Sequence, residues 1–310
     1  MSDTPVTVPV CYRHPSRETY VKCVRCDRPI CPDCMRAASV GHQCPECVAE
    51  GRRTQRPART AFGGGVAGRE GYVTKTLIGL NVLVALLGVA LSGAGALLSG
   101  GLFTSATRLQ FVGAVVGPTF TLVGDRIIFA PLPDLGPVYT GIADGAYYRL
   151  IAAMFIHYGI LHLLLNMWAL WILGRELEAV LGPVRFLGLY LLAGLGGNVA
   201  CYLFSPYSLS AGASTSIFGL FAAFFVILRR LKRDTSAILG LLVVNIVITV
   251  VFSQSISVAG HFGGLVFGAL FGAVLAYAPR ERRTLVQAAG GGAMLAILLV
   301  ATLLKTLTLT

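Results

Sequence analysis

Charged residues are scarce in this chain. Only 13% of its 310 residues are charged, whereas 55% are hydrophobic. Soluble globular domains carry about 25% charged residues, so this composition excludes an ordinary soluble protein. The first ten residues are polar and contain no apolar core, so we expect no cleaved signal peptide there. The sequence therefore predicts a polytopic membrane protein.

Acidic residues are nearly absent from the apolar part of the chain. Between Arg149 and Ala278 they are only Glu176, Glu178 and Asp234, which we place in loops. An intramembrane aspartyl protease would need two carboxylates at membrane depth, and a proton-coupled transporter usually carries one. A metalloprotease of the His-Glu-x-x-His type is also excluded, because that motif does not occur. Serine and histidine remain as the reactive groups of the apolar part.

Cysteine is almost absent after residue 50. Seven of the eight cysteines lie between Cys11 and Cys47, and we interpret Cys201 as a small buried hydrophobe. Residues 1–50 therefore form a separate unit, which we call the head. Its candidate metal ligands form four pairs with two-residue gaps: Cys11 and His14, Cys23 and Cys26, Cys31 and Cys34, and Cys44 and Cys47.

This spacing predicts two tetrahedral, structural zinc sites, because a short gap lets both residues of a pair bind one ion. Eight ligands are needed, and we expect the ninth candidate, His42, to be spare. An interleaved arrangement would join the first pair with the third and the second with the fourth: Cys11, His14, Cys31 and Cys34 on one ion, and Cys23, Cys26, Cys44 and Cys47 on the other.

Over residues 11–47 the head resembles B-box type zinc-binding domains. Two interpretations stay open: the head only folds around its zinc ions, or it binds another protein. A catalytic zinc is not expected, because four protein ligands close each site. Residues 51–75 are rich in Arg and Gly and are interpreted as a flexible linker.

Seven apolar segments come close to the length of about 20 residues that a membrane-spanning helix needs. They are residues 76–98, 150–173, 184–205, 213–230, 236–253, 257–278 and 286–304. We expect the Gly- and Pro-rich loop over residues 99–148 to fold against the membrane surface. The predicted fold class is an all-α polytopic membrane protein with a small zinc-binding domain.

Lys and Arg gather in the loops that would share one side of the membrane with the N-terminus. They are Arg52, Arg53, Arg56, Arg59, Arg69, Lys75, Arg175, Arg185, Arg229, Arg230, Lys232, Arg233, Arg280, Arg282 and Arg283. The other side has only Arg108, Arg126, Arg149 and Lys305. Loops rich in Lys and Arg remain on the cytoplasmic side of the membrane, so we expect a cytoplasmic N-terminus and head. The net charge of +11 then reflects topology, and its dispersion among loops does not favour a nucleic-acid partner.

Ser214 lies at the start of the fourth predicted span, directly after Gly212 and Ala213. Free backbone N–H groups and the helix dipole favour a developing oxyanion at such a position. His261 lies near the start of the sixth predicted span, at the end of a stripe in which glycines recur every four residues: Gly260, Gly264, Gly268 and Gly272. A small-residue stripe allows close helix approach, which a Ser–His hydrogen bond between two helices requires. The alternatives are an N-cap serine and plain helix packing.

The second predicted span contains three further polar residues. His162 and Asn166 are four residues apart and share one helix face, and His157 precedes them. Their side chains can donate hydrogen bonds to an oxyanion. The alternative is interhelical polar contacts, which Asn and His often make in membranes.

Together these residues resemble the rhomboid family of intramembrane serine proteases, over about residues 145–278. The resemblance rests on Arg149, the spacing of His157, His162 and Asn166, the Gly-x-Ser of Gly212–Ser214, and the His-x-Gly-Gly of His261–Gly264. It implies a six-helix core over residues 76–283 and one extra helix over residues 284–310. Thr215 stands where the family most often has Gly, and Tyr148 where Trp is usual.

The resemblance also implies the chemistry. Ser214 would be the nucleophile and His261 the general base, with Asn166, His162 and the Ser214 N–H around the oxyanion and His157 in support. Substrates would be single-pass or polytopic membrane proteins, cleaved near the extracytoplasmic face of the cell membrane. The rivals are an inactive rhomboid relative that binds membrane clients, a transporter or channel, and, ranked far lower, Ser216 as nucleophile.

Overall fold

The computed structural model describes residues 8–55, 58–65, 71–93, 95 and 106–310. Parts of the expected linker, of the first predicted span and of the loop over residues 99–148 lie outside these ranges. The chain divides into two compact units, Met1–Ala58 and Arg59–Thr310. The first unit contains the head, and the second, which we call the body, contains all the predicted spans.

The head has little regular structure. It consists of η1 (Pro32–Cys34), a two-stranded antiparallel sheet of β1 (Arg36–Ala37) and β2 (His42–Gln43), and α1 (Pro45–Thr54). Its buried hydrophobic cluster contains six cysteines and only one other residue, Ile30. Such a core is too small to hold a fold by itself, so the head depends on what its cysteines bind.

Long helices occur near each of the seven predicted places in the body, but the second begins at Gly159 rather than at residue 150, so His157 precedes it. They are α2 (Tyr72–Ser92), α5 (Gly159–Leu181), α6 (Pro183–Phe204), α7 (Ser214–Arg230), α8 (Ser236–Val251), α9 (Val258–Tyr277) and α10 (Arg283–Leu309), the last preceded by η4 (Arg280–Arg282). Among the described residues, five helices are long and apolar enough to cross a membrane: α2, α5, α6, α9 and α10 with η4. The other two are shorter, with 17 residues in α7 and 16 in α8.

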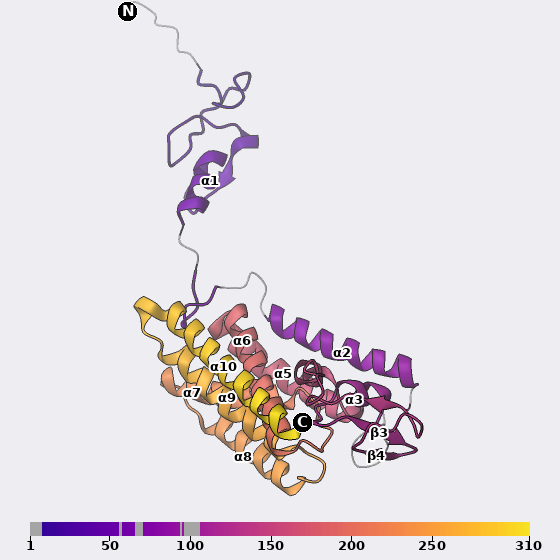
Figure 1. The fold of residues 1–310 in the computed structure, drawn as a ribbon. Helices are drawn as coiled ribbons and strands as arrows, with labels where there is room; N and C mark the ends of the chain where they lie inside the picture. Colours follow the sequence, from indigo (N-terminus) through magenta and orange to yellow (C-terminus); the bar gives the residue numbers. More distant parts are fainter. Residues whose placement is uncertain (1–7, 56–57, 66–70, 94, 96–105) are drawn as a thin grey trace, which may run out of the picture. The chain divides into compact units, whose positions relative to one another are not determined.

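Helices α6, α7 and α9 form the centre of the body, each in contact with the other two. Helix α5 contacts α2, α6 and α7, while α10 contacts α6 and α9 (Figure 1). Helix α8 is held least: of its residues, only Ile238 and Thr249 are buried. The central helices therefore form the packed frame of the body, and α8 flanks it with few buried residues.

The loop before α5 contains structure that an all-α expectation misses. It folds into α3 (Arg108–Gly113), a three-stranded antiparallel sheet of β3 (Phe120–Val123), β4 (Arg126–Ile128) and β5 (Val138–Tyr139), then α4 (Arg149–Ala152) and η3 (Ala153–Phe155). Strands of two to four residues are too short to show a clear alternation in sequence. The loop is fixed by the fully buried Arg149, whose Nε and Nη1 donate to the carbonyls of Thr140 and Ala114 at 2.8 Å each.

Glu176 and Glu178 do not lie in a loop, as we expected, but in α5. Glu178 is in the last turn of that helix, where it is buried. Its carboxylate accepts hydrogen bonds from the backbone N–H groups of Val73 and Thr74, at 2.8 and 2.9 Å, and from the Thr74 hydroxyl at 2.8 Å. These are unpaired N–H groups in the first turn of α2, so the carboxylate caps that helix and binds it to α5.

The expected linker over residues 51–75 also differs from a flexible chain where the structure describes it. Residues 51–54 belong to α1, and a short turn follows in which Arg59 bridges to Gly65. Phe62 of this turn is buried in the core of the body, and its carbonyl accepts from Gln287 of α10 at 3.3 Å. The turn around Phe62 is therefore a packed part of the body.

Candidate active site and metal centre

Ser214 is the first residue of α7, and Ala213 is the N-cap without a side-chain capping bond. The N-cap interpretation of Ser214 is therefore wrong. The chain reaches this point through Gly212, whose φ of +141° is a conformation that L-residues rarely adopt. A Cβ added to Gly212 would lie 2.8 Å from His162 Cε1 and 3.4 Å from Ser214 Oγ. The absence of a side chain at Gly212 thus leaves room for both the Ser214 hydroxyl and the His162 imidazole.

His261 lies in the first turn of α9, buried, beside the serine of α7. Its Nε2 is 2.9 Å from Ser214 Oγ, which is hydrogen-bond distance. The ring of Phe218, one turn along α7, stacks on the imidazole with centroids 4.0 Å apart and planes 19° apart. The structure therefore brings together the two residues that the sequence singles out, in the geometry of a nucleophile and its base.

The other ring nitrogen of His261 has a partner that sequence reasoning missed. Thr249 Oγ1, on α8, is 2.8 Å from His261 Nδ1, and Thr249 is only 1% exposed. A threonine in an apolar helix is usually bonded to its own backbone, so its residue type alone did not distinguish it.

The glycine stripe of α9 makes the close approach that was predicted, with one correction. A Cβ on Gly264 would lie 1.9 Å from the Thr215 carbonyl oxygen, and one on Gly268 would lie 2.2 Å from Gly219 Cα. Ser216 and Gly219 are the small residues that the sequence of α7 offers to this stripe, but Thr215 takes the place of Ser216. Ser216 faces α6 instead, because a Cβ on Gly194 would lie 2.3 Å from its Oγ.

Gly264→Ala should therefore disturb the contact between Ser214 and His261, even though Gly264 touches neither residue. The added methyl must push α9 away from α7, and overpacking of this kind costs about 1–3 kcal/mol. We expect a lower melting temperature of the detergent-solubilised protein. The matched control is Gly292→Ala on α10, where an added Cβ meets nothing within 4 Å and alanine should be neutral or stabilising. Equal melting temperatures for the two variants would contradict the close packing.

Two of the three polar residues of the second predicted span, His157 and His162, contact the segment just before the nucleophile. The His162 ring lies against Gly212, and His157 lies edge-on to it with centroids 5.1 Å apart. The Ala213 N–H donates to His157 Nε2 at 3.4 Å. Asn166 instead donates from Nδ2 to the His162 carbonyl at 2.8 Å, and in the described part of the chain it has no hydrogen bond to Ser214.

The two departures from the family pattern have places of their own. Thr215 turns its side chain toward Gly197 of α6 and Gly260 of α9, since Cβ atoms added there would lie 2.6 Å from its Cβ and 3.1 Å from its Cγ2. Gly197 and Gly260 therefore make room for the side chain of Thr215, at a position where the family most often has glycine. Tyr148 donates from its hydroxyl to the Val112 carbonyl at 2.9 Å and helps to fix the loop.

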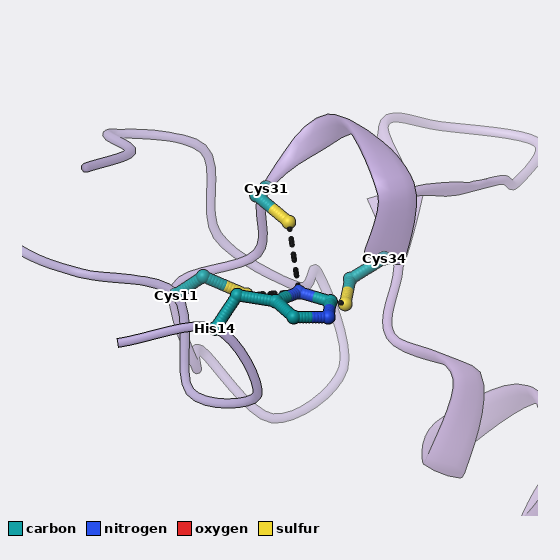
Figure 2. A group of neighbouring side chains, drawn as sticks. All are labelled: Cys11, His14, Cys31 and Cys34. Carbon is teal, nitrogen blue, oxygen red and sulfur yellow. Dashed lines mark hydrogen bonds between the residues drawn. The ribbon is translucent and has the colours of Figure 1, made fainter. Parts of the chain in front are cut away.

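The head brings its candidate ligands into the two groups that the spacing predicts. They are Cys11, His14, Cys31 and Cys34, and Cys23, Cys26, Cys44 and Cys47, with the ligand atoms of each group within 4.8 Å of one another. Figure 2 shows the first group, where the His14 ring lies among the three sulfurs, with Nδ1 3.2 Å from Cys31 Sγ and 3.4 Å from Cys34 Sγ. In the described chain His42 joins neither group.

The chemistry of these groups fits a cation. Burial raises the pKa of the Cys34 thiol to about 11 and that of Cys47 to about 12, with neighbouring cysteines adding to the effect. For Cys11, hydrogen bonds from backbone N–H groups outweigh burial and lower the pKa to about 6. Four crowded sulfur or imidazole ligands suit zinc, whose charge would keep all the thiols deprotonated.

Comparison with known proteins identifies the body. The family description "Rhomboid domain" matches residues 144–278. Rhomboid protease GluP of Bacillus subtilis (strain 168) is 41% identical over 138 residues, which cover 43% of this chain and 27% of GluP. "Putative rhomboid protease YdcA" of the same bacterium is 33% identical over 148 residues, which cover 46% of this chain and 74% of YdcA. The chain belongs to the rhomboid family.

This rhomboid also resembles a relative that is named as inactive. Inactive rhomboid protein 1 of Danio rerio is 39% identical over 95 residues, which cover 31% of this chain and 11% of that protein. Family membership therefore does not decide activity by itself. Together with the apolar helices of the body, it does indicate an integral membrane protein.

Proposed function

We propose that this rhomboid is an intramembrane serine endopeptidase that cleaves transmembrane helices of other membrane proteins. The observation that carries the proposal is the 2.9 Å contact between Ser214 Oγ and His261 Nε2. The names of the relatives GluP and YdcA support the same activity. No carboxylate is part of the pair, so the proposed catalytic unit has no acidic member.

All seven long helices of the body would cross the bilayer, six as the protease core and α10 as an extra span. The distribution of Lys and Arg supports a cytoplasmic N-terminus and head. Ser214 and His261 would then face the extracytoplasmic side of the cell membrane, near the N-terminal ends of α7 and α9. The substrates would be single-pass or polytopic membrane proteins cut near that face, with no nucleic-acid partner.

The reaction would run through an acyl-enzyme. Neutral His261 takes the hydroxyl proton through Nε2 as Ser214 Oγ attacks the carbonyl carbon of the scissile peptide. The imidazolium then gives the proton to the leaving nitrogen, the C–N bond breaks, and the acyl group stays on Oγ. Water, deprotonated by His261, hydrolyses the ester and restores the serine.

The oxyanion would be held by the Ser214 N–H at the start of α7, with His162 and Asn166 as side-chain donors. The nearness of His162 to Gly212 supports its role as a donor. His157 would hold the His162 ring in place through their edge-on contact. Asn166 would have to give up its bond to the His162 carbonyl in order to donate. The substrate helix must unwind locally, because helical carbonyls are hydrogen-bonded and shielded.

The head would bind two structural zinc ions through the two ligand groups described above. Each group supplies four protein ligands, which leaves no open position for catalysis. The head would therefore contribute stability or a binding surface, and the chemistry would belong to the body.

The proposal is tested by co-expressing the full chain with a test substrate, a single-pass membrane protein whose span contains Gly and Pro near its extracytoplasmic end. We expect a cleaved fragment with the wild type and none with Ser214→Ala. The matched control is Ser216→Ala, two residues further on, whose hydroxyl is buried against α6 and should be dispensable.

Cleavage that persists in Ser214→Ala would contradict the proposal, and cleavage lost only in Ser216→Ala would move the nucleophile. If neither the wild type nor any variant cleaves, while the test substrate still co-purifies with the chain, the inactive client-binding relative becomes the better account.

A further inference from the structure

The hydroxyl of Thr249 has a single proton and two neighbouring atoms that could accept it. Thr249 Oγ1 is 2.8 Å from the carbonyl oxygen of Asn245, one turn earlier in α8, and also 2.8 Å from His261 Nδ1. A carbonyl oxygen can only accept, so the hydroxyl donates its proton to Asn245. The remaining contact then requires His261 Nδ1 to carry a hydrogen and donate it to Thr249 Oγ1.

This arrangement favours one tautomer of His261. In a neutral imidazole only one nitrogen is protonated, so a hydrogen on Nδ1 leaves Nε2 with a free lone pair. Nε2 is the nitrogen 2.9 Å from Ser214 Oγ. The ring is thus held in the form that can accept the serine proton, which in serine proteases with a triad is the task of a carboxylate.

We propose that Thr249 is the third member of the catalytic unit, a positioning residue that fixes the tautomer and orientation of His261. The proposal rests on the proposed function. Thr249 accepts from Nδ1–H before the proton transfer and can keep that bond when the ring becomes an imidazolium. A neutral hydroxyl does this without placing a charge in the apolar part of the chain, where a carboxylate would be costly.

No other side chain in the described part of the chain shares this task. The hydrogen bonds of the His261 ring go to Ser214 and Thr249, and Phe218 covers one face of the ring through its π-system. Thr249 is also one of only two buried residues of α8. The base is therefore fully positioned only while α8 lies against α9.

The test compares three variants of the full chain in detergent. Thr249→Val keeps the shape and removes the hydroxyl, whereas Thr249→Ser keeps the hydroxyl. Thr302→Val on α10 is the matched control, because Thr302 is also buried and also donates to the carbonyl four residues before it, Leu298, at 2.8 Å, but far along the chain from the pair. Each variant should be assayed at the same number of degrees below its own melting temperature.

The kinetic readout is the labelling of Ser214 by an alkyl fluorophosphonate. We expect the maximal labelling rate of Thr249→Val to be about tenfold lower, the order of one neutral hydrogen bond, with the concentration for half-saturation unchanged. Thr249→Ser and Thr302→Val should label like the wild type. A wild-type rate in Thr249→Val, or an equal loss in Thr302→Val, would overturn the proposal.

The second readout does not depend on activity. Nitrogen-15 NMR of the chain labelled at histidine separates protonated from unprotonated ring nitrogens, and His261→Gln identifies the signals. We expect His261 protonated at Nδ1 in the wild type and a shift toward Nε2 in Thr249→Val. Protonation at Nε2 in the wild type would overturn the role of Thr249, whereas correct protonation with no labelling of the wild type would count against the proposed function alone.

Discussion

His261→Ala is expected to lower the rate of test-substrate cleavage by at least about 10³-fold, because general base catalysis and the activation of a serine depend on one imidazole. The serine hydroxyl is a weak nucleophile without a base. His162 cannot take over, since its ring borders Gly212 and has no hydrogen bond to Ser214 in the described part of the chain. The oxyanion donors would remain, so a small residual rate is expected.

The matched control for this prediction is Phe262→Ala. Phe262 follows His261 directly, is 41% exposed and makes no ring contact in the described part of the chain. It should leave the cleavage rate within a few-fold of the wild type. Cleavage by His261→Ala within tenfold of the wild type would show that the proposed base is not the base.

Cys23→Ser is expected to remove one of two zinc ions per chain and to unfold much of the head. The apolar core of the head contains Ile30 and otherwise cysteines, so it has little besides metal to hold it. In zinc-finger peptides the binding of structural zinc contributes roughly 10–16 kcal/mol to folding. The result would be seen as zinc content by mass spectrometry and as faster proteolysis within residues 8–55, with the body intact because it is a separate unit.

The control for the zinc prediction is His42→Ala. His42 is the ninth candidate ligand and lies outside both groups of the described chain. We expect it to keep two zinc ions and wild-type resistance to proteolysis. If His42→Ala lost zinc and Cys23→Ser did not, the assignment of the ligands would be wrong.

Features that repeat along the sequence were predictable. The four ligand pairs of the head group as expected, because a two-residue gap allows few geometries. The glycines of α9 meet α7 at Thr215 and Gly219, because a period of four places small residues on one helix face. His261 stands at the end of that stripe, which is why its partner Ser214 could be named from the sequence.

Features that depend on a single contact between distant segments could not be predicted. Thr249 differs from other threonines in apolar helices only by the imidazole across from it. Glu178 looks like a loop residue until α2 presents its first N–H groups to it. Phe62 lies in an Arg- and Gly-rich stretch that has the composition of a linker, and only the structure shows it buried in the core of the body.

The most direct test of the central claim is to identify the atom that an alkyl fluorophosphonate modifies in the purified full chain. We expect one adduct, on the peptide containing Ser214, with labelling abolished in Ser214→Ala, strongly reduced in His261→Ala and unchanged in Ser216→Ala. An unlabelled wild type, or an adduct on any other residue, would contradict Ser214 and His261 as the catalytic pair of this rhomboid.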